Sequence, residues 1–377
     1  VLPLLGAALS GLCTTLLLFG RLTPLNGDLG FVATFFVTFL AAYAALVSIT
    51  EDRPAVIDRV MAVLLTASAV VAFVALLSVV VFVLARGKDA LTHWNFYTED
   101  LSTTGPLDPL TKGGIAHALV GTLIMTAISL VITVPLGVAC SVYLNETRGR
   151  MTNLVRTVVT AMTALPSILA GLFIFATWVL ILGYERSGFA ASIAMSIMML
   201  PIIVRSADVV LRLVPGNLRE AAAALGAPQW RTVWHVVLPT ARSGLTTSVI
   251  LGMARGMGET APILLTAGFT SSMNLNPTDG PMVSLPLAAF ELVRSPQPSQ
   301  IARGFGTAAV LMVLVLILFT IARIIGGRPA GQLSTRQANA TVTRSARDLH
   351  RIDARRLAKA TAGAEPRPHA ATTEAHS

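Results

Sequence analysis

The chain has 377 residues, of which 54% are hydrophobic and only 12% are charged, and its mean hydropathy is +0.72. Such a composition excludes an ordinary soluble domain and favours an all-α protein that crosses a membrane several times. A net charge of +9 would suit nucleic acid, but the arginines lie mostly in the loops between apolar runs and in the tail, where membrane topology explains them better. We therefore predict a polytopic protein that contacts membrane lipid and binds no nucleic acid.

Two apolar runs, at about 2–19 and 31–49, open the chain. The first has the length of a signal peptide, but no small-residue cleavage site follows it, so we expect a membrane helix. Residues 51–54 are polar and end in Pro54, which begins a boundary. The sequence thus predicts that residues 1–58 form a two-helix extension.

Six further apolar runs define a predicted core over residues 59–326, which brings the expected number of transmembrane helices to about eight. Prolines within these runs are expected to kink their helices. The predicted kink positions are Pro166 with Ser167, Pro201 and Pro262. The six runs cover about 60–84, 114–143, 154–182, 189–211, 241–269 and 304–325.

The tail, residues 327–377, is basic and differs in character from the core. Ala346, Leu349, Ile352 and Leu357 lie roughly along one helical face, which indicates a short surface helix within 345–360. The residues after Gly363 have the composition of a disordered segment. We predict a solvated, partly disordered cytoplasmic tail.

The short-loop arginines indicate the orientation of the chain. They fall at 53–59, at 148–150, at five positions within 205–242, and in the tail, and the predicted spans place all four regions on one side. The positive-inside rule makes that side the cytoplasm. Both termini are then predicted to be cytoplasmic.

A polar, basic segment separates the runs at 189–211 and 241–269. Residues 218–225 are strong helix formers, and Gly226 follows where a helix ends in the left-handed conformation. Pro228 is suited to begin a second short helix, and Pro239 is expected to stop it. The segment therefore predicts two short helices joined by a fixed elbow at the membrane face, for which an amphipathic connector lying on lipid headgroups is the plainer alternative.

The spacing of this segment resembles the EAA signature of permeases in bacterial ABC importers, with Val236 in the place of the usual isoleucine. The resemblance implies that residues 212–239 form a coupling loop that docks into a cleft on a separate cytoplasmic ATPase. The matching positions, which the resemblance assigns to ATPase coupling, are Glu220, Ala221, Ala222, Gly226, Leu238 and Pro239.

The run at 241–269 contains two charges, Arg255 and Glu259, near the expected middle of the bilayer. They lie four residues apart and therefore on one helix face. Because a buried charge is costly in a membrane, the pair predicts either a substrate path or an ion pair that holds two spans together. Pro262 favours the substrate path, since irregular backbone at membrane depth is tolerated where it lines a cavity. Thr260 adjoins the pair and is placed on the same predicted path.

The stretch from Ala254 to Pro262 resembles the corresponding segment of PstA-type phosphate permeases, and residues 165–173 and Asn145-Glu146 are similar to that family's pattern too. The likeness covers about 60–325, a six-helix ABC importer permease core. It implies an inner-membrane importer of inorganic phosphate that works by alternating access. The partners it implies are a PstC-like permease, a PstB-like ATPase dimer and a PstS-like phosphate-binding protein.

The chain itself is not expected to be an enzyme or to hold a cofactor or metal. Its one Gly-Lys pair, Gly87-Lys88, is followed by Asp89 and does not fit an ATP-binding P-loop, so ATP is expected to be used by the partner ATPase. Three alternatives remain: a permease for another oxyanion such as sulfate, an intramembrane enzyme that uses Arg255 and Glu259, and a structural subunit packed in lipid. The first should lack the Arg-x-x-x-Glu pattern, the second lacks a nucleophile–base set, and the third needs no coupling loop.

Overall fold

The structure is a computed structural model that describes residues 2–22, 27–327, 340, 342–349, 351–352 and 354. These residues are helical or irregular and contain no strand, which confirms the predicted all-α class. The chain divides into two compact units, residues 1–92 and 93–377.

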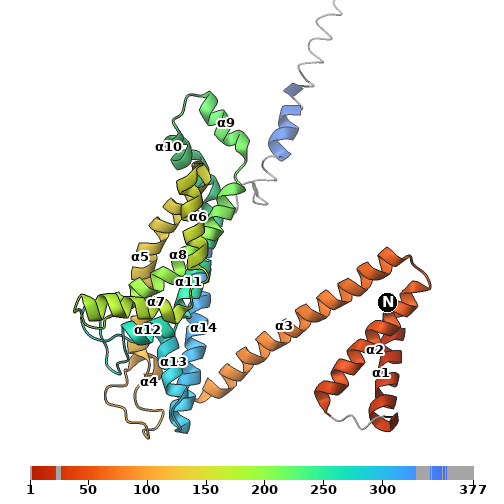
Figure 1. Cartoon of the computed structure of the whole chain (residues 1–377), viewed down its shortest axis with the longest axis horizontal. Helices are drawn as coiled ribbons and strands as arrows, with labels where there is room; N and C mark the ends of the chain where they lie inside the picture. Colours follow the sequence, from red (N-terminus) through yellow and green to blue (C-terminus); the bar gives the residue numbers. More distant parts are fainter. Residues whose placement is uncertain are drawn as a thin grey trace, which may run out of the picture. The chain divides into compact units, whose positions relative to one another are not determined.

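The first unit consists of three long helices, drawn in red and orange in Figure 1. Ala7, Tyr43 and Val47 are buried where α1, α2 and the start of α3 meet. The unit includes α3, which the sequence analysis assigned to the core, whereas the functional boundary at residue 58 stays a prediction. The bounds are α1 (Leu2–Leu17), the π-helical turn η1 (Leu18–Leu22), α2 (Asp28–Ser48) and α3 (Arg53–Leu91).

The second unit contains the helices between residues 95 and 326. They are α4 (Asn95–Thr98), α5 (Ala116–Glu146), α6 (Arg150–Met162), α7 (Ser167–Ile174), η2 (Phe175–Ile181), α8 (Gly188–Arg212), α9 (Gly216–Ala224), α10 (Gln229–Thr232), η3 (Val233–Val237), α11 (Leu238–Met257), α12 (Ala261–Thr266), α13 (Leu285–Val293) and α14 (Pro298–Gly326).

Helix α8 lies at the centre of this unit and contacts α5, α6, α7, α11 and α12. Glycines allow α5 and α11 to lie close to α8. A Cβ on Gly137 of α5 would lie 2.7 Å from Ile203 Cγ2, and one on Gly252 of α11 would lie 2.4 Å from Ile203 Cγ1. A Cβ on Gly256 would meet Met199 Sδ at 2.4 Å. Gly252 and Gly256, four residues apart on α11, thus form a small-residue pair that lets α11 pack closely against α8.

Helix α8 continues through Pro201 from Gly188 to Arg212, so Pro201 does not end the helix, and the predicted kink there stays a prediction. Half of the apolar stretch of α8 is buried inside the protein. Helices packed on several sides hold the backbone in place despite the missing N–H, as is common for proline in membrane helices.

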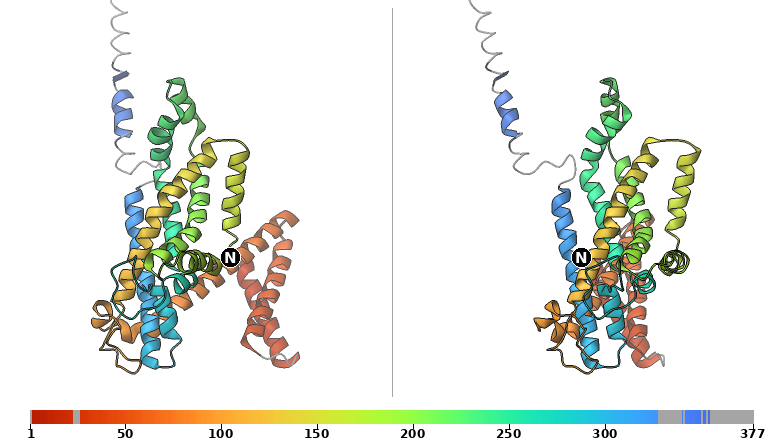
Figure 2. Two further views of the ribbon diagram at one scale, coloured as in Figure 1. Left: turned by 60° about the vertical axis from the view of Figure 1, so that its left-hand side comes forward. Right: turned by 90° about the vertical axis from the view of Figure 1, so that its left-hand side faces the viewer.

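The run at 154–182, expected as one kinked span, consists instead of α6 and then α7 with η2, bent by 103°. Figure 2 shows α7 turned across the direction of α6. The bend falls at Pro166, whose extended backbone directly precedes the first residue of α7, Ser167. The residue before a proline avoids the helical conformation, which explains why the break lies here.

Seven helices within the described residues are long and apolar enough to cross a membrane, or eight if the bent pair is one span. A polytopic membrane protein is thus confirmed, with eight spans on the second count. Of the tail helix predicted at 345–360, residues 345–349, 351–352 and 354 are described, and these are helical and exposed. The rest of that prediction lies outside the described residues.

At the end of the unit opposite α9, two loops are tied together. Leu101 N donates to Ser271 O at 2.9 Å, and Met273 N donates to the Asp100 carboxylate at 3.0 Å. A hydrogen bond from Ser102 Oγ, 2.6 Å long, lowers the pKa of Asp100. Asp100 therefore acts as the acceptor that joins these loops.

Candidate functional site

The coupling loop, residues 212–239, lies at one end of the second unit, with α9 and α10 beyond the ends of α5 and α8 (Figure 1). Helix α9 ends at Ala224, and Gly226 has φ +75°, as its place after a helix predicts. The second helix starts directly after Pro228. The predicted elbow between two helices is therefore confirmed.

The signature residues lie on the outer surface of the elbow. Glu220 and Ala221 are exposed and Ala222 is half-buried, while the neighbouring Leu225 is 88% exposed. Leu213 and Trp230 of the same loop are exposed as well, and several exposed apolar side chains on one loop indicate a surface against which another protein packs. The structure thus places Glu220, Ala221 and Ala222 together where a partner has access to them.

Pro239 does not stop the second helix, contrary to expectation. Residues 229–257 form one helical span in which α10, the π-helical turn η3 and α11 follow without a break. Proline clashes with the carbonyl four residues earlier in a regular α-helix, and the wider η3 turn just before it relieves this clash. Leu238 packs against the buried cluster that includes Leu211 and Val237, so the base of the loop is fixed by apolar contacts.

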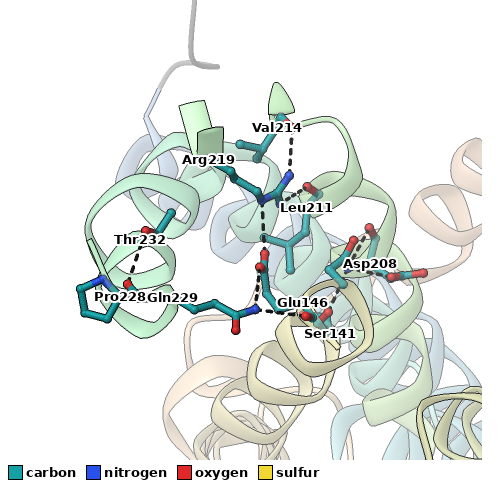
Figure 3. Close-up of polar contacts among 10 residues, drawn as sticks. Ser141, Glu146, Asp208, Leu211, Val214, Arg219, Pro228, Gln229 and Thr232 are labelled. Carbon is teal, nitrogen blue, oxygen red and sulfur yellow. Dashed lines mark hydrogen bonds and ion pairs between the residues drawn. The ribbon is translucent and has the colours of Figure 1, made fainter. Parts of the chain in front are cut away.

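Glu146, the last residue of α5, contacts both halves of the coupling loop (Figure 3). Its Oε1 lies 3.3 Å from Arg219 Nε in α9, and its Oε2 lies 3.5 Å from Gln229 Nε2 in α10. Gln229 Nε2 also donates to the main-chain oxygen of Glu146 at 3.1 Å. Sequence reasoning assigned no role to this residue, although the Asn145-Glu146 pair was part of the resemblance.

Asp208 of α8 forms a second polar cluster beside the first. Its carboxylate accepts hydrogen bonds from Asn145 Nδ2 at 2.7 Å, Arg156 Nη1 at 3.1 Å and Arg212 Nη2 at 2.8 Å. The Asp208 side chain is only 12% exposed. It therefore joins α5, α6 and α8. Only the pair with Arg212, four residues along α8, follows a local pattern, because Asn145 and Arg156 lie in other helices.

Arg255 and Glu259 are brought together as the spacing predicts, with Arg255 Nη2 2.9 Å from Glu259 Oε1. This oxygen is buried and in ion-pair contact, yet it does not meet hydrogen-bond geometry with any group in the described residues. The half-buried Thr260 comes next in the three-residue break between α11 and α12. Glu259 and Thr260 thus lie in the interruption, and Arg255 lies in the last turn of α11 before it.

The two helix breaks of the unit pack against each other. Helices α7 and α12 are in contact, and a Cβ on Gly171 would lie only 2.5 Å from Pro262 Cα. Pro262 is in the first turn of α12, so it begins a new helix after the break. The segment after Pro166 and the segment after Glu259 are therefore neighbours in space.

Comparison with known proteins shows which family the chain resembles. Residues 133–329 match the model of the binding-protein-dependent transport system inner membrane component. The phosphate transport system permease protein PstA 1 of Mycobacterium tuberculosis (strain CDC 1551 / Oshkosh) is 39% identical over 259 residues, which are 68% of this chain and 84% of that protein. PstA of Mycobacterium leprae (strain TN) is 41% identical over 248 residues, 66% of this chain and 80% of that protein.

Among solved structures, the inward-facing MetNI methionine ABC transporter aligns with a TM-score of 0.41 and 20% identity, over 56% of this chain and 91% of that one. The family match covers more than half of the chain and includes the coupling loop, the Arg255–Glu259 pair and both helix breaks. This chain belongs to the family of inner membrane components of binding-protein-dependent transport systems.

Proposed function

We propose that this chain is the permease subunit of an ATP-driven importer of inorganic phosphate. The observation that carries the proposal is the EAA-type coupling loop, exposed on a fixed elbow, in a chain whose relatives are named PstA phosphate transport permeases. A lipid-packed structural subunit needs no such loop. The chain contributes to the translocation path and hydrolyses no ATP itself.

The proposed complex has four kinds of component. A second, PstC-like permease completes the path, a PstB-like ATPase dimer engages Glu220 and the alanines after it, and a PstS-like protein delivers phosphate from outside. The chain lies in the bacterial inner membrane with the coupling loop and both termini in the cytoplasm, as the loop arginines indicate. Closure of the ATPase dimer moves the coupling loop and rocks the core helices between two states of access.

Arg255 and Glu259 are proposed to handle the anion within the path. The Arg255 side chain is 54% exposed and offers a planar, permanently charged fork that matches phosphate oxygens. The buried Glu259 oxygen can accept a hydrogen bond from the hydroxyl of phosphate, whereas sulfate at neutral pH has no such donor. The pair thus supplies attraction and a reason to prefer phosphate over sulfate.

The test is uptake of labelled phosphate and labelled sulfate by cells that lack their own phosphate importer. The chain is supplied together with its partner subunits, and cells that receive the partners alone serve as the control. We expect phosphate uptake that depends on the chain and is not reduced by excess sulfate. Uptake of sulfate with equal or greater efficiency would select the alternative oxyanion permease.

A further inference from the structure

The contacts of the coupling loop converge on one side chain. Glu146 holds α9 through Arg219 and α10 through Gln229, although Gln229 lies 83 residues further along the chain. Arg219 and Glu220 are neighbours with different surroundings, because the Arg219 side chain is 29% exposed beside Glu146 whereas Glu220 is exposed on the surface. Glu220, which belongs to the proposed docking surface, and Arg219, which attaches the loop to Glu146, are thus adjacent in sequence.

Arg219 and Asn145 extend these contacts to the ends of α8 and α5. Arg219 donates through Nη1 to Val214 O and through Nη2 to Leu211 O, both at 3.3 Å, so it also caps the last turn of α8. Asn145, the neighbour of Glu146, bonds the Asp208 carboxylate of α8 at 2.7 Å. At the end of α5, Glu146 therefore holds the coupling loop (Figure 3), and its neighbour Asn145 holds α8.

We propose that Glu146 is a positioning residue for energy coupling: it fixes the two halves of the coupling loop to the end of α5, so that movement of the loop is passed to α5 and α8 together. This inference rests on the proposed function, in which a partner ATPase moves the loop. Glu146 itself touches neither the partner surface nor the transported anion.

A purely stabilising role makes a different prediction. The Glu146 side chain is 16% exposed and that of Arg219 is 29% exposed, so a purely stabilising ion pair would show its loss as a lower unfolding midpoint of the whole protein. Apolar packing around Leu211, Val237 and Leu238 holds the base of the loop independently of Glu146. Loss of the carboxylate should therefore leave the fold and the docking surface intact but loosen the connection between loop and helices.

The experiment uses the complete transporter in proteoliposomes, with Cys13 and Cys140 replaced by alanine and a spin label on Ala224→Cys, which is exposed at the end of α9. Glu146→Gln, Arg219→Gln and the double variant form a cycle. Glu291→Gln is the matched control, because Glu291 is also a partly buried carboxylate in an ion pair, with Arg294 at 3.5 Å, but in α13. Label mobility, ATP hydrolysis and phosphate uptake are measured on the same samples.

We expect Glu146→Gln to increase label mobility and to lower the phosphate moved per ATP hydrolysed by about fivefold or more, with hydrolysis retained. The double variant should lose less than the sum of the two single losses, because Glu146 and Arg219 share one contact while each also has others. Glu291→Gln should match the parent protein. Unchanged label mobility, or equal loss of uptake and hydrolysis, would overturn the role of Glu146. A parent complex that moves no phosphate would instead overturn the proposed function, and the mobility result would still decide whether Glu146 positions the loop.

Discussion

Arg255 and Glu259 are in contact across one helical turn, yet one side chain is 54% exposed and the other only 5%. The arginine can therefore turn away from the carboxylate toward a ligand, while the carboxylate stays buried at the break between α11 and α12.

The first prediction tests this pair with Arg255→Gln, Glu259→Gln and the double variant. If both groups handle the anion, each single variant loses phosphate uptake, and Glu259→Gln admits more sulfate because the carboxylate no longer repels it. The double variant should remain inactive, measured as initial uptake rates of both labelled anions. If the pair is only structural, Arg255→Gln leaves the buried Glu259 charge unpaired, and the double variant, which removes that charge, should recover much of the uptake.

The second prediction concerns the exposed carboxylate of the coupling loop. Glu220→Lys should abolish uptake and the co-purification of the ATPase, because it reverses a charge on the proposed docking surface. The amount of the protein in the membrane should not change. Glu185→Lys is the control, since Glu185 is an equally exposed carboxylate in the turn between η2 and α8. Normal ATPase binding by Glu220→Lys would refute the assigned docking role.

The third prediction concerns the elbow. Gly226 has φ +75° and a Cβ there would meet no atom within 4 Å, so Gly226→Val is strained only by its backbone conformation, at a cost of about 1–2 kcal/mol. We expect reduced uptake with nearly normal thermal stability of the core, measured by the unfolding midpoint in detergent. Gly216→Ala is the control, because Gly216 also has open space around it but a φ outside the positive range. Equal uptake by both variants would show that the elbow angle is unimportant.

The fourth prediction concerns the Asp208 cluster. Asp208→Asn removes the charge that faces Arg156 and Arg212, which are 40% and 54% exposed, so solvent partly compensates and the expected loss of stability is about 1–3 kcal/mol. The unfolding midpoint in detergent should fall. The exposed Asp279 provides a control in Asp279→Asn, which should leave the midpoint unchanged. A midpoint as high as that of the parent would mean that Asp208 does not hold α5, α6 and α8 together.

Features encoded by adjacent residues were predictable from the sequence, and those that depend on distant neighbours were not. The membrane helices follow from local hydropathy, and the left-handed Gly226 follows from its place after a run of helix formers. Pro239 was predicted to stop its helix because the rule for proline considers the lost hydrogen bond and the steric clash, but not the π-helical turn before Pro239 that accommodates the ring.

The site was predictable to a similar extent. The contact between Arg255 and Glu259 follows from a spacing of four residues on one helix. Glu146 contacts Arg219 and Gln229, which lie 73 and 83 residues further along the chain, and Asp208 contacts Asn145, 63 residues before it. No local sequence pattern predicts contacts between residues so far apart. The polar connections between the coupling loop and the helices were therefore visible only in three dimensions.

The uninterrupted helical span from Gln229 to Met257 has a mechanical consequence. Its 29 residues, at about 1.5 Å each, make a rod of roughly 43 Å, with the second half of the coupling loop at one end and Arg255 in the last turn at the other. A tilt of about 5° around the loop end would displace the far end by about 4 Å, which is more than the 2.9 Å that separates Arg255 from Glu259. Glu259 lies beyond Gly258, where the helix ends, so a tilt of the span relative to α12 would move Arg255 away from Glu259 and part the two charges.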